Sequence, residues 1–457
     1  MTDLRVEEAL EQIRRHDIHS VRVVFADQHG LLRGKTVAAT SMERAFEHGI
    51  GVPGSLLHKD TGNTYAIDLW KPSGDATLDA LVGARNVVMR PDPSTLRQLP
   101  WADGTAIVLS DLESDSGQAI PHSTRGICAR AVERLDAHQL TFIAGLELEF
   151  HLYAVDAGGQ LTHSHPGWDL LGEGTLDRIE PAIEPIRRGL VSMGLPPVTI
   201  EAELGPSQIE MTFAPTVGLD VADQAMLVRT AIRHIARRTG FRASFMSRPR
   251  VDGESFPSGW HLHQSLASCA DSTRSSAFTP TDATRLLSDL GRNYVAGLLH
   301  HASAACLLTT PTVTGYKRYR PRAITPDRVS WSRDHRGAML RVIGGPGDPA
   351  TRVENRVGDP AANPYLLVAS QIFSGLDGIE HNRTPPPPTE SPYEPEGGPP
   401  LPRTLGDAIA AFDASPLFRD VLGDGVVDYL VTLKGSEWNR FNAAVTDWEQ
   451  REYFDLF

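Results

Sequence analysis

Four segments of the chain alternate apolar with charged or polar residues, which is the pattern of β-strands with one buried face. In TFIAGLELEFHLY, leucine and phenylalanine take one face, whereas Glu147, Glu149 and His151 take the other. The same alternation occurs in VTIEAELGPSQIEMTF, GWHLHQSL and TRVENRVG. One such strand could simply have a solvated face. Four together predict a sheet whose apolar faces form a core and whose polar faces line one cavity.

The polar faces carry acids and imidazoles, and arginines accompany them. A turn at Gly205-Pro206-Ser207 would bring Glu203 close to Glu210. Neighbouring carboxylates repel each other unless water or a cation separates them. An oxygen-rich set with a single imidazole suits Mg²⁺ or Mn²⁺ better than Zn²⁺. Arginines suited to phosphate or carboxylate ligands follow at Arg318, Arg336, Arg341, Arg352 and Arg356.

The remaining pattern indicates two domains, since 457 residues exceed one ordinary core. Before residue 105, a helix, a strand–turn–strand and a further strand ended by prolines indicate a small α/β unit. Beyond it, strands alternate with helices, and a proline-rich loop interrupts them. Amphipathic segments predict helices over residues 4–16, 124–138 and 223–238. We predict an N-terminal domain over residues 1–105 and a second domain over residues 106–457.

Composition and charge exclude several classes of function. The formal net charge of −13 argues against nucleic acid as a partner, because a phosphate backbone requires a basic face. The three cysteines are far apart and form no CxxC pair, which favours a reducing compartment. The charged N-terminus does not resemble a secretory signal, and no apolar run approaches the roughly 20 residues that span a bilayer. We therefore expect a cytoplasmic protein without a membrane partner.

Six motifs resemble the glutamine synthetase family in order and spacing: GLELEF, EAELGPSQIE, SGWHLHQSL, YKR, HRGAMLR and RVENRVGDPAANPYL. The last motif is highly specific. The resemblance implies an α+β fold, in which an N-terminal β-grasp domain precedes a catalytic antiparallel sheet or half-barrel flanked by helices. It also implies a homo-oligomer, a dodecamer of two hexameric rings with active sites between neighbours. ATP would be a co-substrate, with Mg²⁺ or Mn²⁺ at two or more sites.

The resemblance also implies a role for each matching residue. The first metal site would comprise Glu149, Glu203 and Glu210, and the second Glu147, His261 and Glu354. The expected ATP contacts are His263, Ser265, Arg341 and Arg352. The residues expected to bind glutamate are Arg318, Arg356 and Gly259. The catalytic groups would be Arg336, which stabilises the transferred phosphoryl group, together with Arg318 and Glu149.

The chain departs from the family pattern where ammonium is bound. Two aspartate positions correspond to Pro53 and Asn86, the flap glutamate to Ile324, and an Asn-Gly pair to Phe256-Pro257. Ammonium needs several acceptors and a base, which proline and isoleucine do not supply.

A tentative amine pocket would therefore comprise Pro53, Phe256, Ile324 and Glu201. A polyamine is an alternative substrate, because Glu201 or Asp327 could bind its distal ammonium group.

These departures predict an ATP-dependent ligase that joins the γ-carboxylate of L-glutamate to an organic primary amine through γ-glutamyl phosphate. One alternative is an ammonia-using glutamine synthetase with relocated ammonium ligands. A second is a catalytically inactive structural or regulatory relative. The second is disfavoured because all six expected metal ligands and all five arginines are kept.

Overall fold

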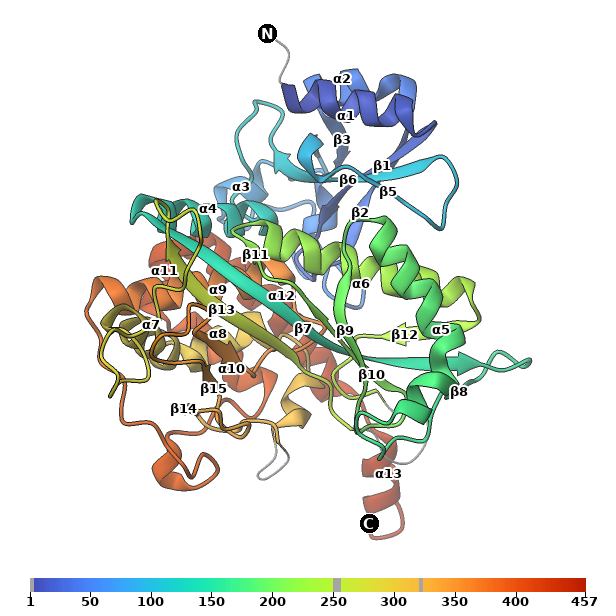
Figure 1. The fold of residues 1–457 in the computed structure, drawn as a ribbon. Helices are drawn as coiled ribbons and strands as arrows, with labels where there is room; N and C mark the ends of the chain where they lie inside the picture. Colours follow the sequence, from blue (N-terminus) through green and yellow to red (C-terminus); the bar gives the residue numbers. More distant parts are fainter. Residues whose placement is uncertain (1–3, 250–255, 320–323) are drawn as a thin grey trace.

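The computed structural model describes residues 4–249, 256–319 and 324–457, and Figure 1 shows their arrangement. A smaller six-stranded sheet with the order β2-β1-β6-β4-β3, in which β5 pairs with β6, forms the N-terminal part. Helices α1 (Leu4–Arg15) and α2 (Met42–His48) accompany it. Its strands are β1 (Ser20–Ala26), β2 (Leu32–Ala38), β3 (Ile50–Pro53), β4 (Asn86–Pro91), β5 (Arg97–Gln98) and β6 (Thr105–Glu113). This sheet has a hydrophobic core of its own.

The predicted boundary at residue 105 coincides with the first residue of β6. That strand pairs in parallel with β1 and antiparallel with β4, so it lies within the N-terminal sheet. The turn at Asp103-Gly104 connects β5 to β6, which are antiparallel neighbours. Turn residues alone do not distinguish a hairpin connection from a linker between domains.

The second sheet has ten strands around the long central strand β7 (Leu140–Val155). Its main order is β14-β15-β16-β13-β7-β10-β9, and β8, β11 and β12 also pair with β7. The other strands are β8 (Leu161–His163), β9 (Pro197–Ala202), β10 (Gln208–Phe213), β11 (Thr216–Val217), β12 (Phe241–Ser244), β13 (Trp260–Ser268), β14 (Trp331–Arg333), β15 (Leu340–Ile343) and β16 (Arg352–Asn355). This mostly antiparallel sheet confirms the predicted α+β class with a catalytic half-barrel.

Helices cover the apolar face of this sheet. The helices predicted over residues 4–16, 124–138 and 223–238 are confirmed to within a few residues as α1, α4 and α6. The helices of this part are α4 (Thr124–Ala137), α5 (Glu173–Ser192), α6 (Asp220–Arg238), α7 (Asp289–His300), α8 (Ala302–Thr309), α9 (Pro364–Glu380), α10 (Leu405–Asp413), α11 (Pro416–Leu422), α12 (Asp424–Ala443) and α13 (Asp447–Tyr453), while the short α3 (Ala76–Asp79) precedes β4. No helix in the described ranges has the length and apolar character needed to cross a membrane.

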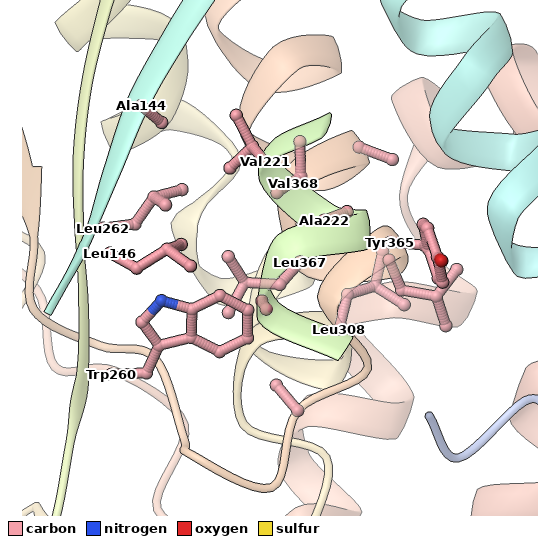
Figure 2. Packing of buried hydrophobic residues seen from close by; sticks show 14 of the residues in the cluster. Ala144, Leu146, Val221, Ala222, Trp260, Leu262, Leu308, Tyr365, Leu367 and Val368 are labelled. Carbon is pink, nitrogen blue, oxygen red and sulfur yellow. The ribbon is translucent and has the colours of Figure 1, made fainter. Parts of the chain in front are cut away.

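The apolar side chains of the alternating strands form the main core, as their pattern predicts. Leu146 of β7 and Leu262 of β13 are paired across the two strands, and both are buried. Figure 2 shows these side chains and Trp260 directed toward α6 and α9. Because neighbouring side chains on a strand point in opposite directions, this packing turns the charged residues between them to the other face.

Candidate active site

A cavity of about 730 Å³ lies on the charged face of the second sheet. Its lining contains most of the candidate residues, whose carboxylates and imidazole form what we call the carboxylate floor. The floor consists of Glu147, Glu149, Glu201, Glu203, Glu210 and His261. Arginines lie around it at Arg318, Arg336, Arg341 and Arg356, and Gly259 completes the expected glutamate-binding set. The prediction that the strands share one charged cavity is therefore confirmed.

Strand register accounts for the floor. Glu149 of β7 lies opposite Glu210 of β10, and Glu147 lies opposite His261 of β13. On its other side, Glu210 lies opposite Glu201 of β9. Glu203 follows β9, and its backbone N–H donates to the carbonyl of Gln208. The predicted reversal thus brings Glu203 and Glu210 together.

The carboxylates are held close enough to share cations. Ligand atoms lie within 4.8 Å of one another in three groups: Glu147, Glu210 and His261; Glu147, His263 and Glu354; and Glu201, Glu203 and Glu210. These groups differ from the predicted division into two sites. Glu147 and Glu210 each belong to two groups, Glu201 and His263 are added, and Glu149 belongs to none of the three. Carboxylate oxygens and one or two imidazoles suit a hard divalent cation, so the donor set fits Mg²⁺ or Mn²⁺.

Electrostatic repulsion within the floor supports this fit. Burial, reinforced by the charges of Glu147 and Glu149, raises the pKa of Glu210 to about 11. Burial together with Glu203 raises the pKa of Glu149 to about 8. The pKa of Glu147 is lowered although burial opposes ionisation, because His261 and His263 favour its charged form. A bound cation would favour the ionised form of all these acids.

Glu354 contacts two arginines that line the cavity. It is fully buried, it forms an ion pair with Arg356, and its Oε2 lies 3.0 Å from a terminal nitrogen of Arg341. Burial raises the pKa of its carboxyl, but Arg356 and His261 outweigh that effect, so the pKa is lowered overall. Arg341 also donates to Asp334 at 2.6 Å, which fixes its guanidinium over the floor.

Close packing fixes Arg318 beside Gly259. One nitrogen of Arg318 donates to the carbonyls of Val357 and Gly358 at 3.1 and 2.6 Å. A Cβ at residue 259 would lie 2.7 Å from the other nitrogen of Arg318 and 2.9 Å from Nε2 of His261. Glycine is therefore required at this position because any side chain would displace both groups.

Gln208 is a polar residue of the site to which the sequence assigned no role. Its Nε2 donates to the carboxylate of Glu149 at 2.6 Å, while its Oε1 accepts from the backbone N–H of Gly205 at 2.8 Å. The side chain is fully buried. Gln208 therefore orients Glu149, and its place on the charged face of β10 could have identified it.

Some candidate residues lie outside the cavity lining. His263 contacts Glu147 at 2.9 Å and accepts from Arg352 at 3.2 Å, so these two lie beside the floor. Ser265 is buried further along β13. His151, expected on the charged face, is buried, and its Nδ1 forms a hydrogen bond with the hydroxyl of Ser258, just before β13.

The two aspartate-replacing positions lie together in the N-terminal sheet. Pro53 ends β3 and is paired with Asn86 at the start of β4. Phe256, Ile324 and Glu201 line the cavity, but Pro53 of the same chain does not. The four residues expected in the amine pocket are therefore not brought together within one chain. Asp327, considered for a polyamine, is also absent from the lining.

Apolar side chains line part of the cavity, which we call its apolar end, and the sequence predicts only two of them. Phe256 and Ile324 were expected there, but Leu170 and Leu171 also line it. They belong to a loop between β8 and α5, whose composition gives no periodic pattern. Only the folded chain brings this loop to the floor.

Comparisons with known proteins agree with this geometry. The model of the glutamine synthetase catalytic domain matches residues 121–453. The chain is 40% identical to a γ-glutamylanilide synthase from Acinetobacter sp., with 98% of this chain and 95% of that protein covered. It is 33% identical to a γ-glutamylethanolamide synthetase from Streptomyces coelicolor, with 99% and 96% covered. A solved structure of GmaS in complex with ADP has a TM-score of 0.82 and 26% identity over 100% of both chains. With its carboxylate floor, its arginines and these matches, the chain belongs to the glutamine synthetase family.

Proposed function

We propose that the chain is an ATP-dependent ligase that joins the γ-carboxylate of L-glutamate to an organic primary amine. The observation that carries this function is the composition of one cavity: a carboxylate floor, four arginines and an apolar end. The floor and the arginines suit ATP and glutamate, whereas the apolar end suits the body of an amine. Relatives named as γ-glutamylanilide and γ-glutamylethanolamide synthetases support the same class of reaction.

In the first step, an oxygen of the γ-carboxylate of glutamate attacks the terminal phosphorus of ATP. A new O–P bond forms, the bond to the leaving ADP oxygen breaks, and γ-glutamyl phosphate results. Arg318 and Arg356 hold the substrate carboxylates, and Arg336 and Arg341 offset the charge of the transferred group. Mg²⁺ or Mn²⁺, held by the floor and by Glu354, would supply charge neutralisation and phosphate alignment. The expected ATP contacts at His263, Ser265 and Arg352 remain part of this proposal.

In the second step, the amine nitrogen attacks the acyl carbon of γ-glutamyl phosphate. The C–N bond forms and the C–O bond to phosphate breaks. The proton released from the nitrogen is taken up by the departing phosphate, which leaves as hydrogen phosphate. Phosphate is a good leaving group, whereas the oxide of a free carboxylate is not. Gly259 lets Arg318 and His261 approach the backbone closely beside the proposed position of the reacting acyl group.

Ammonia is disfavoured as the second substrate because its usual acceptors are replaced. Ile324 and Phe256 line the cavity with hydrocarbon, which can neither bind ammonium nor accept its proton. Pro53 and Asn86 lie in the N-terminal sheet, so they would reach an amine only across a contact between subunits. The inactive alternative is disfavoured because the floor and its arginines converge on one cavity.

We also propose a homo-oligomer, namely a dodecamer of two hexameric rings. Figure 1 shows α13 projecting from the rest of the chain at its C-terminal end. Large apolar side chains are exposed on and beyond this helix, at Trp448, Tyr453, Phe454, Leu456 and Phe457. Such a surface is typical of a contact with another copy. The cytoplasmic location expected from the sequence remains a prediction, as does the absence of nucleic-acid and membrane partners.

An amine panel tests the proposed function. Purified protein would be incubated with ATP, Mg²⁺ and glutamate, and phosphate release would be measured with ammonium, ethanolamine, aniline, isopropylamine and putrescine. We expect at least one organic amine to exceed ammonium in kcat/KM, and mass spectrometry to identify the γ-glutamylamide. Equal or better turnover with ammonium would favour an ordinary glutamine synthetase. An absence of turnover with every amine would favour an inactive relative.

A further inference from the structure

The apolar end of the cavity consists of residues that take no part in the proposed phosphoryl transfer. Leu170, Leu171, Phe256 and Ile324 line it. Trp168 contacts the ring of Phe256 edge to face, with ring centroids 6.3 Å apart and planes at 85°. We call these five residues the apolar wall.

The apolar wall is exposed rather than buried in the core. Trp168 is 66% exposed, Leu171 59%, and Leu170 and Ile324 48% each. Single exposed hydrophobic residues are common, but a group that lines or adjoins one polar cavity marks a binding surface.

The backbone conformation of the wall is unusual for its residues. Trp168, Leu171 and Ile324 have φ angles of 64°, 57° and 61°. Among described residues other than glycine with positive φ, these three carry the large apolar side chains. Asparagine or glycine adopts this conformation at lower cost, and a β-branched residue is an outlier there. Strained backbone of this kind persists mainly at functional sites.

The loop that carries the wall is attached directly to the carboxylate floor. The backbone N–H of Trp168 donates to the carbonyl of Leu204 at 2.8 Å, and that of Leu171 donates to the carbonyl of Ala202 at 2.9 Å. Glu201 and Glu203 neighbour these acceptors in the chain. The apolar wall therefore has a fixed position relative to the site where the acyl phosphate would form.

Building on the proposed function, we infer that the apolar wall binds the body of the amine and selects a flat, uncharged, aromatic amine. Ring faces and edges of Trp168 and Phe256 suit an aromatic ring. The nitrogen lone pair of an arylamine is delocalised into its ring, so the amine arrives neutral at pH 7 and needs no carboxylate to deprotonate it first. An amine that needs no such carboxylate is compatible with Ile324 at the position where the family pattern has a glutamate. A diamine would place its second ammonium against hydrocarbon, which is unfavourable.

The test compares amine preference in two variants, Leu171→Asn and Trp168→Ala. Asparagine tolerates the left-handed backbone, and the backbone hydrogen bond of residue 171 does not depend on its side chain. We expect each variant to lower kcat/KM for aniline by about tenfold or more, chiefly through KM, because apolar pocket contacts discriminate by about 10- to 200-fold. The kcat/KM for ammonium should change by less than about twofold. Val198→Asn is the matched control, since Val198 is exposed on β9 and lies outside the cavity lining.

An unchanged ratio of aniline to ammonium turnover in both variants, with thermal unfolding like that of the wild type, would overturn the inference. Preference of the wild-type enzyme for putrescine over aniline would also overturn it. If the wild type ligates no amine, the proposed function fails instead. Aniline binding by isothermal titration in the presence of ATP and glutamate then decides: the inference stands if the wild type binds aniline and Leu171→Asn weakens binding about tenfold or more, and it falls otherwise.

Discussion

The two ends of the cavity are built in opposite ways. The carboxylate floor lies on and beside paired strands, and its side chains are held by register and by contacts such as that of Glu147 with His261. The apolar wall lies on loops, and three of its residues are held in left-handed backbone. The floor brings like charges close together, whereas the wall exposes apolar side chains and holds three residues in a strained backbone conformation.

This difference separates two requirements of one reaction. Phosphoryl transfer needs charges fixed at definite separations, which rigid strands provide. Amine selection needs a surface that can differ between relatives, and loops can change without disturbing a sheet. Changes in the floor should therefore affect turnover with every amine, whereas changes in the wall should affect the choice among amines.

The largest effect is expected for Arg336→Gln. Arg336 lines the cavity, and loss of its charge should lower kcat by about 10²–10³-fold with every amine, because a charge-stabilising donor is removed from the transition state. Steady-state phosphate release measures it. Arg333→Gln is the control, since Arg333 is exposed outside the lining. A fall in kcat with only some of the amines would contradict the division of roles, in which the floor serves turnover with every amine and the wall selects among amines.

Metal addition should stabilise the floor and leave the wall unaffected. A cation present at 100 times its Kd would raise the free energy of unfolding by about 2.7 kcal/mol, measurable by calorimetry with Mn²⁺ or Mg²⁺. In Glu210→Gln the metal-free protein should be more stable, because the substitution removes a carboxyl group whose ionised form is disfavoured by burial and by the charges of Glu147 and Glu149. The metal-induced increase should shrink. Glu180→Gln on the surface of α5 is the control. A full metal response in Glu210→Gln would contradict the assignment of this residue.

A smaller effect is expected for Gln208→Met, which removes the donor to Glu149. The free energy of unfolding should fall by about 1–3 kcal/mol, because a buried polar contact loses its partner. The kcat should fall in the same proportion for aniline and for ethanolamine, since Gln208 acts through the floor. Urea unfolding and the amine panel measure the two effects. A change in amine preference would place Gln208 with the wall instead.

The smallest effect concerns backbone strain at Ile324. In Ile324→Asn the free energy of unfolding should rise by up to about 1 kcal/mol, because asparagine accepts positive φ more readily. The kcat/KM for aniline should fall at the same time. Ala84→Asn, also at positive φ but in the N-terminal part, should give the stability gain without the loss of activity. Lower stability in Ile324→Asn would show that strain is not what distinguishes the wall.

Strand alternation was sufficient to predict the charged face of β7, but not what covers it. Glu147 and Glu149 reach the cavity, whereas His151, two residues further along, is buried where β12 pairs with β7. Alternation determines the side of a sheet to which a residue points, and neighbouring elements determine its exposure. For the same reason, the boundary predicted at residue 105 falls at the start of β6, which pairs with strands of the N-terminal sheet.

The sequence alone determined the chemistry of the floor and the family, because a period of two and specific motifs are local properties of the chain. Tertiary structure decided which carboxylates share a cation group, since Glu201 joins Glu203 and Glu210 through the register of β9 with β10. It also determined the composition of the apolar wall. Leu170 and Leu171 line the same cavity as Phe256 and Ile324 only because loops distant in sequence converge there. Such contacts depend on long-range packing, which no local pattern encodes.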